Sequence, residues 1–156
     1  MENVLLARVD DRLIHGQVMT AWMKRLPAKE IMVIDNKVAK DEFMISVLEM
    51  AAPPGVKVKV FSEKDAANIL KEGLKTPTIL LAKSPLAYRR IIEEGVELEA
   101  INLGGMGINE KRETLYKNIA ASEEERNAIK ECLEKGIDIK IQVIPDDKIV
   151  DVKDVI

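Results

Sequence analysis

The stretch VLLARVDDRLIHGQVMTAW, residues 4–22, decides the fold because it contains a strand, a turn and a helix in immediate succession. The apolar run Val4–Val9 is typical of a buried strand, and the apolar side chains after Gly16 predict a helix that extends to Leu26. Between them lies a charged turn that includes His15, the only histidine of the chain. This order predicts a βα unit in which the charged turn lies at the carboxyl end of the strand.

Strand-like and helix-like runs continue to alternate over almost all of the 156 residues. Further strands are expected over residues 30–34, 56–61, 78–82, 98–103 and 138–144. The helices that connect them are expected over residues 40–52, 62–73, 84–95 and 122–135. Such alternation is typical of α/β proteins. We therefore predict one domain over residues 1–156, a single open, mostly parallel sheet with helices on both faces.

The composition of the strands predicts their positions in this sheet. The first strand is a near-continuous apolar run, which is expected when both faces of a strand are covered, so we place it centrally. Residues 56–60 and 137–143 alternate strictly between apolar and polar side chains, which places those strands at or near the edges. Two segments stay open: residues 115–119 as a short strand, and the tail 149–156 as an edge strand or a helical turn.

Composition argues against several classes of function. The net charge of −3 and the aromatic content of 3% do not suit a nucleic-acid surface. One histidine and one cysteine, Cys132, are too few for a His/Cys metal site, and the glycine motifs of dinucleotide and ATP sites are missing. A membrane span needs ~20 apolar residues, and no such run occurs. We expect a cytoplasmic protein without metal, cofactor or nucleic-acid partner, with Cys132 as a small buried hydrophobe.

The side chains around His15 are those that a phosphoryl-accepting imidazole needs. A helix start favours an anion through its free backbone N–H groups. Arg12, and Arg8 at the strand end, offer planar pairs of donors to phosphate oxygens. Asp10 or Asp11 is expected to accept a hydrogen bond from one imidazole nitrogen and so direct the other nitrogen outward.

Glycines and polar residues that follow the strands are expected at the same rim of the sheet. Gly16, directly after His15, permits close approach of a ligand. The other candidate rim residues are Asp35, Asn36, Ser84, Gly104 and Gly105. Because loops are polar in any case, this convergence is weak support for a site.

The spacing alone leaves a plainer interpretation open. Histidines in loops are often structural or merely solvated, aspartates are common turn formers, and Arg12 can be an ordinary surface residue. The helix after His15 has more apolar side chains than one core-facing stripe needs. Most of them are expected in the core, and Met19, Trp22 or Met23 is a candidate for a partner surface beside the turn.

Residues 8–18, RVDDRLIHGQV, resemble the phosphorylation loop of the enzyme IIB subunits of the mannose/fructose/sorbose class of the bacterial phosphotransferase system (PTS). The likeness continues along the chain through Trp22 and residues 35–41, 50–56, 102–106, 117–118 and 143–148. It implies a cytoplasmic carrier that associates peripherally with a membrane permease. A histidine of a IIA component donates the phosphoryl group, which passes to a sugar entering through the IIC and IID components.

The resemblance also implies roles for individual residues. His15 is expected to be the nucleophile and phosphoryl carrier, through Nδ1, and Arg12 the main charge partner of the phosphoryl group. Arg8, Asp10 and Asp11 are expected to support them. The implied activity is that of a protein-histidine–sugar phosphotransferase without a cofactor. The alternative is a regulatory module that uses phosphorylation of His15 only as a switch, and a phosphomonoester hydrolase is disfavoured because a second histidine is missing.

Overall fold

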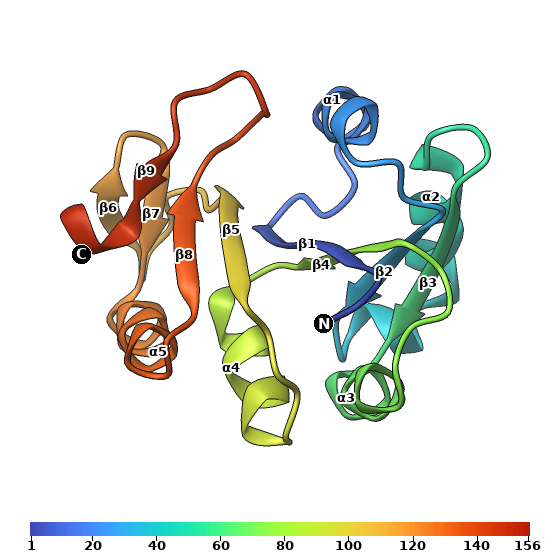
Figure 1. Ribbon diagram of the computed structural model, residues 1–156. Helices are drawn as coiled ribbons and strands as arrows, with labels where there is room; N and C mark the ends of the chain where they lie inside the picture. Colours follow the sequence, from blue (N-terminus) through green and yellow to red (C-terminus); the bar gives the residue numbers. More distant parts are fainter.

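Seven strands form one sheet, in the order β3-β2-β4-β1-β5-β8-β9, in the computed structural model, which describes residues 1–156 (Figure 1). The strands are β1 (Val4–Asp10), β2 (Glu30–Ile34), β3 (Lys57–Phe61), β4 (Thr78–Ala82), β5 (Ala100–Gly105), β8 (Asp138–Ile141) and β9 (Val150–Asp151). All neighbouring pairs are parallel except β8 and β9, which are antiparallel. The prediction of a mostly parallel sheet with the first strand at its centre is therefore confirmed.

Helices cover both faces of this sheet, as the alternation predicted (Figure 1). One face carries α1 (Gly16–Arg25) and α2 (Glu42–Ala51), and the other carries α3 (Glu63–Glu72), α4 (Pro85–Glu93) and α5 (Glu123–Glu134). The core accordingly has two parts, with 25 buried residues on the side of α3–α5 and 10 on the side of α1 and α2. No helix is both long enough and apolar enough to span a bilayer.

The shorter elements explain where the pattern was ambiguous. The tail 149–156 forms both an edge strand and a helical turn, the two alternatives that its sequence allowed. Strand β9 pairs with β8, and the 3-10 turn η2 (Val152–Asp154) follows it. A hairpin of β6 (Glu113–Tyr116) and β7 (Ile119–Ala121) occupies the other uncertain segment. The strictly alternating strands are β3, at one edge, and β8, next to the other edge, as predicted.

The second helix begins two residues later than its apolar pattern predicted. Residues 38–40 form a separate 3-10 turn, η1 (Val38–Lys40). The carboxylate of Asp41 then accepts a hydrogen bond from the backbone N–H of Met44 at 3.1 Å, which makes Asp41 the N-cap of α2. An aspartate cap of this kind sets where a helix starts, whereas apolar periodicity does not.

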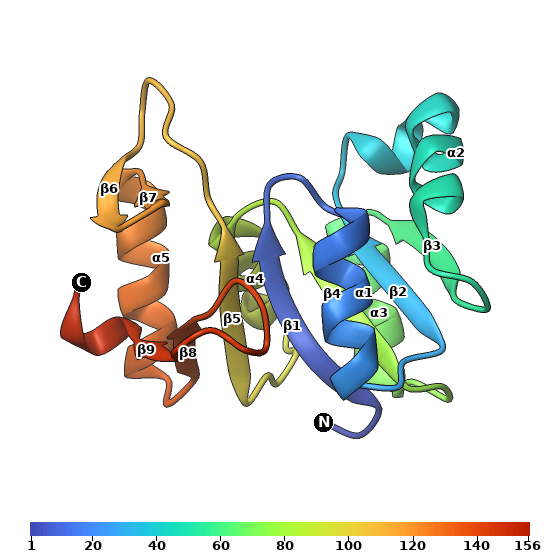
Figure 2. The ribbon, with the colours of Figure 1, turned by 90° about the horizontal axis from the view of Figure 1, so that it is seen from above.

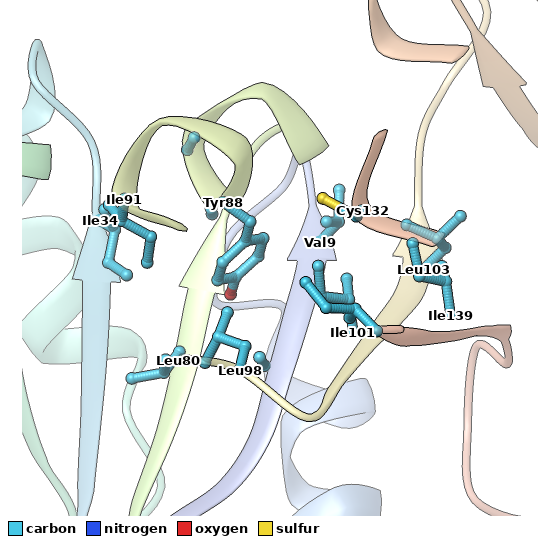
Figure 3. Packing of buried hydrophobic residues seen from close by; sticks show 14 of the residues in the cluster. Val9, Ile34, Leu80, Tyr88, Ile91, Leu98, Ile101, Leu103, Cys132 and Ile139 are labelled. Atoms are coloured by element: carbon cyan, nitrogen blue, oxygen red, sulfur yellow. The ribbon is translucent and has the colours of Figure 1, made fainter. Parts of the chain in front are cut away.

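Tyr88 joins α4 to the central strand within the larger core (Figure 3). Its side chain is fully buried, and its hydroxyl donates a hydrogen bond to the backbone oxygen of Arg8 at 2.9 Å. Burial raises the pKa of Tyr88, so the hydroxyl keeps its proton and remains a donor. This bond attaches α4 to β1 at Arg8, near the carboxyl end of the strand, where the charged turn begins. Cys132 is buried in the same cluster, as expected.

The connections of β1 and β4 place the charged turn at a topological switch point of the sheet. These two strands are neighbours, yet α1 leaves β1 over one face toward β2 and α4 leaves β4 over the opposite face toward β5. The loops at their carboxyl ends therefore diverge. In open parallel sheets such a switch point is where ligands bind. Residues 11–15 and 83–84 follow the two strands at this point.

Candidate functional site

His15 is exposed at the carboxyl edge of the sheet, as the N-cap residue of α1. Its backbone is extended, with φ −109° and ψ 109°, and its side chain makes no capping hydrogen bond. Figure 2 shows the turn that carries it between α2 and the segment 106–112, both of which extend beyond the strand ends. His15 is therefore an exposed residue on a turn that lies between two protruding elements.

The two residues before His15 anchor the turn from below. Leu13 and Ile14 are 2% and 8% exposed and belong to the smaller core. Leu13 has a φ of 58°, a left-handed conformation that is a genuine outlier for so bulky a residue. Its N–H donates to the backbone oxygen of Asp10 at 2.9 Å. Burial of these side chains therefore reverses the chain and leaves His15 outside. No residue type in the turn signals this conformation, so the sequence analysis missed Leu13.

Asp10 holds the guanidinium of Arg12 by one edge. Arg12 donates from Nε to Oδ1 and from Nη2 to Oδ2 of Asp10, both at 3.0 Å, and its backbone N–H also donates to Oδ1 at 3.0 Å. The Asp10 side chain is 1% exposed, whereas that of Arg12 is 44% exposed. Nη1 of Arg12 has no hydrogen-bond partner in the protein. The outer edge of this guanidinium is therefore free to bind an anion.

Arg8 contacts Asp10 from inside the protein. Its Nη2 donates to Oδ2 of Asp10 at 3.1 Å, and its Nη1 donates to Oδ1 of Asn102 at 2.7 Å and to the carbonyl of Gln142 at 3.2 Å. Its guanidinium carbon also lies 5.6 Å from the centre of the Trp22 ring. Arg8 is fully buried, so the expectation that it donates directly to phosphate is wrong. Burial lowers the pKa of Arg8, although the nearby Asp10 opposes this decrease.

Neither aspartate of the turn orients the imidazole, contrary to the expectation. The carboxylate oxygens of Asp10 are occupied by Arg8 and Arg12, and Asp11 belongs to a second network. Burial by itself would raise the pKa of Asp10, but hydrogen bonds from Arg12 and the charges of both arginines outweigh it and hold the pKa below its usual value. The carboxylate therefore stays charged between the two guanidinium groups.

The second network connects the turn to the segment after β5 and to α5. Asp11 accepts hydrogen bonds from the N–H of Gly107 at 2.8 Å and from Nη1 of Arg112 at 2.9 Å. Arg112 also donates from Nε and Nη2 to the two oxygens of Glu125, at 2.8 and 2.9 Å. Glu125 accepts a further hydrogen bond from the hydroxyl of Ser84 at 2.7 Å. One set of contacts thus joins the ends of β1, β4 and β5.

Arg112 and Glu125 were not predicted as site residues. Glu125 completes a capping box with Ser122 at the start of α5, a local role that its sequence position indicates. Its pairing with Arg112 and the contact of Arg112 with Asp11 join residues 13 and 101 positions apart. A single arginine in a polar loop carries no local signal of such contacts.

Gly104 and Gly105 allow the buried arginine and aspartate to pack against β5. A Cβ at Gly104 would collide with the guanidinium of Arg8, and one at Gly105 would collide with the carboxylate of Asp10. In contrast, a Cβ at Gly16 would meet no atom within 4 Å. The space at the start of α1 is therefore open.

Two predicted rim residues stabilise other loops and do not contact the His15 turn. Asp35 accepts hydrogen bonds from the N–H groups of residues 37 and 38, both at 2.9 Å. Asn36 accepts one from the N–H of Glu63 at 2.8 Å. Ser84 caps α4 and reaches the turn only through Glu125.

The apolar side chains of α1 belong mainly to the core. Met19 and Trp22 are 1% and 6% exposed, and Nε1 of Trp22 donates to the carbonyl of Val143 at 2.9 Å. The interpretation of these two residues as a partner surface is wrong, because the loop after β8 and the sheet cover them. Met23 is only partly buried and packs beside the smaller core.

The family described as PTS system sorbose subfamily IIB component matches residues 4–156. The sorbose-specific EIIB component of Klebsiella pneumoniae is 34% identical over 154 residues, which cover 97% of this chain and 94% of that protein. The mannose-specific EIIAB component of Escherichia coli is 31% identical over 147 residues, which cover 91% of this chain and 45% of that protein. The crystal structure of the IIBSor domain of the Klebsiella pneumoniae sorbose permease has a TM-score of 0.90 at 31% identity, covering 97% of this chain and 94% of that chain.

Proposed function

Because this chain belongs to the sorbose subfamily of PTS IIB components, which are phosphoryl carriers of sugar transport, we propose that His15 is the residue that carries the phosphoryl group. A IIB component is a phosphotransferase that works with a IIA component and with the membrane components IIC and IID. We propose that residues 1–156 act as one IIB unit in the cytoplasm, in peripheral contact with the permease. The likeness to a mannose-specific EIIAB protein supports a IIA domain as the phosphoryl donor.

The observation that carries the proposal is the distribution of free donors among the arginines of the site. Arg8 is fully buried, and the Arg112 side chain is 9% exposed with four hydrogen bonds to the protein. Arg12 alone combines an exposed guanidinium with an unused edge, and it lies three residues before the exposed His15. A phosphoryl group on this imidazole would therefore find one preorganised cation at the surface.

The first transfer replaces one P–N bond by another. A lone pair of the His15 imidazole attacks the phosphorus of the donor phosphohistidine, and the bond between that phosphorus and the donor nitrogen breaks. The charge on the three equatorial oxygens is shared by Arg12 and by the free N–H groups at the start of α1. Nδ1 is assigned as the attacking nitrogen from the family resemblance.

The second transfer delivers the group to the sugar. A sugar hydroxyl oxygen attacks the phosphorus, the bond between the phosphorus and the His15 nitrogen breaks, and the hydroxyl proton balances the step by returning to the departing imidazole through solvent. Asp10 assists both transfers by holding one edge of Arg12, and Arg8 assists by neutralising Asp10 from the interior. Neither of these two buried groups contacts the phosphoryl group itself.

The test is phosphate transfer from labelled phosphoenolpyruvate through the general PTS proteins and a IIA protein of the mannose class. Wild-type protein should acquire one acid-labile phosphate, and His15→Ala should acquire none while it keeps its circular dichroism spectrum. Label retained by folded His15→Ala would refute the assignment. Membranes that contain IIC and IID distinguish the regulatory alternative, because a regulator would accept phosphate and never deliver it to sugar.

A further inference from the structure

Arg112 occupies a position between the His15 turn and α5. Its guanidinium donates from Nη1 to Asp11 at 2.9 Å and to the carbonyl of Gly107 at 3.1 Å, and from Nε and Nη2 to Glu125 at 2.8 and 2.9 Å. The side chains of Arg112 and Glu125 are 9% and 5% exposed. This ion pair is therefore largely shielded from solvent. Its only connection to the His15 turn is through Asp11, which Arg112 and the N–H of Gly107 both contact.

The hydrogen bonds of Arg112 leave almost nothing for a substrate. A guanidinium has five N–H donors, and four of those of Arg112 point to protein oxygens. Arg12 uses two of its side-chain donors on Asp10 and is 44% exposed. The two arginines therefore differ in the role that they can have. Arg12 can contact a phosphoryl group directly, whereas Arg112 can act only through the residues to which it is hydrogen-bonded.

The turn has two lateral attachments, one on each aspartate. Asp10 attaches it to Arg8 in the interior, and Asp11 attaches it to Gly107 and Arg112. The backbone N–H of Asp11 also donates to the carbonyl of Gly105 at 2.9 Å. Between these attachments and α1, the backbone passes through the left-handed Leu13. A strained turn keeps one conformation only when its surroundings determine it fully, so each attachment contributes to the placement of His15.

We propose that Arg112 is a positioning residue for phosphoryl transfer, which fixes the His15 turn by holding Asp11 against the segment after β5. This inference rests on the proposed role of His15 as the carrier. In-line transfer between two histidines depends on the alignment of the attacking nitrogen, and displacements of about 1 Å reduce rates about 100-fold. Loss of the attachment should therefore lower the transfer rate more than it lowers the affinity for the IIA donor.

The test variant is Asp11→Asn, which keeps the size of the side chain and leaves the Arg112–Glu125 pair in place. We expect single-turnover transfer from saturating phospho-IIA to fall by about tenfold or more, with the half-saturating IIA concentration changed by less than about twofold. Arg112→Gln should show the same split, and Arg112→Lys, which keeps a charge for Asp11, should recover part of the rate. The double variant Asp11→Asn/Arg112→Gln should be no slower than the slower single variant, because the two residues act as one unit.

The matched control is Arg89→Gln, which removes an arginine that contacts three acidic residues, Glu93, Glu124 and Glu131, on the α4 and α5 side of the molecule. Its transfer rate should equal that of the wild type. Wild-type transfer by Asp11→Asn, or rate losses of the single variants that multiply in the double variant, would overturn the positioning role. His15→Ala is measured in parallel: if it accepts phosphate, the proposed carrier itself is wrong, whereas failure of the Asp11 result alone leaves His15 as the carrier.

Discussion

Arg12 and Asp10 contact each other edge to edge, with the distances Nε–Oδ1 and Nη2–Oδ2 both 3.0 Å. Two parallel bonds restrict rotation of a planar guanidinium more than a single bond does. The same carboxylate also accepts a hydrogen bond from the buried Arg8. The exposed edge of Arg12 is therefore oriented before any phosphoryl group arrives, at no further cost when transfer occurs.

Replacement of Arg12 tests this orientation. Arg12→Ala should reduce the rate of phosphoryl transfer by about 100- to 1,000-fold, the usual effect of losing one donor to a transition-state oxygen. Its unfolding free energy should change by less than about 1 kcal/mol, because the lost ion pair is half exposed and Asp10 keeps Arg8 as a partner. Arg12→Lys should recover little of the rate, since an ammonium cannot bind Asp10 and phosphate with two separate edges. A wild-type rate in Arg12→Ala would remove Arg12 from the mechanism, and a wild-type rate in Arg12→Lys would contradict the requirement for two separate edges.

Asp10→Asn should destabilise the protein because it leaves the buried Arg8 without a counter-ion. Removing one member of a buried ion pair costs about 3–5 kcal/mol of unfolding free energy, which urea denaturation measures. The control is Asp146→Asn at the exposed ion pair between Asp146 and Arg25, which should cost less than about 1 kcal/mol. Equal losses in the two variants would contradict the structural role assigned to Asp10.

Gly104→Ala should disturb the same network by steric collision. The added methyl group would overlap the guanidinium of Arg8, which is fully buried and held by Asp10, Asn102 and Gln142. Overpacking of a filled interior costs about 1–3 kcal/mol. Gly16→Ala is the matched control for stability, because its Cβ meets open space and alanine favours a helix by ~1 kcal/mol over glycine. The melting temperature should fall in the first variant and not in the second.

Acid should weaken the second network through Glu125. Burial would raise the pKa of this carboxyl, but the hydrogen bonds from Arg112, Ser84 and the N–H of Ser122 outweigh it and lower the pKa. The unfolded state then binds more protons than the folded state in the pH range between the two pKa values. The contribution of Glu125 to the unfolding free energy should therefore rise with pH through that range, up to about pH 4–5, and be lost as the pH falls through the same range. Glu125→Gln should flatten this dependence in urea titrations, and an unchanged slope would contradict the lowered pKa.

The parallel sheet was predictable because its signals are local. An apolar run followed by a cap-like serine and a helical pattern predicts a βα unit without knowledge of distant residues, as at Ser62 and Ser84, which both cap helices. The apolar character of β1 also predicted its central place. The start of α2 was misplaced because the capping contact of Asp41 was not recognised.

The arginines of the site were harder to assign. Arg8 and Asp10 are two residues apart on one strand, so the period of a strand already places them on the same face. The strand pattern does not show which residues cover that face. In the structure they are Trp22 of α1, Asn102 and Gln142. An arginine beside a ligand and an arginine sealed in the interior look the same in the sequence.

The sequence by itself determined the order of elements, the edge of the sheet at which the charged turn lies, and the family, because each depends on residues adjacent in the chain. Only the tertiary structure decided which arginine faces solvent, since that choice depends on side-chain and backbone groups about 90 to 130 positions away in the chain. Burial keeps Arg8 away from solvent, and four hydrogen bonds to the protein occupy most of the donors of Arg112. The outer edge of Arg12 stays free beside the exposed turn that carries His15.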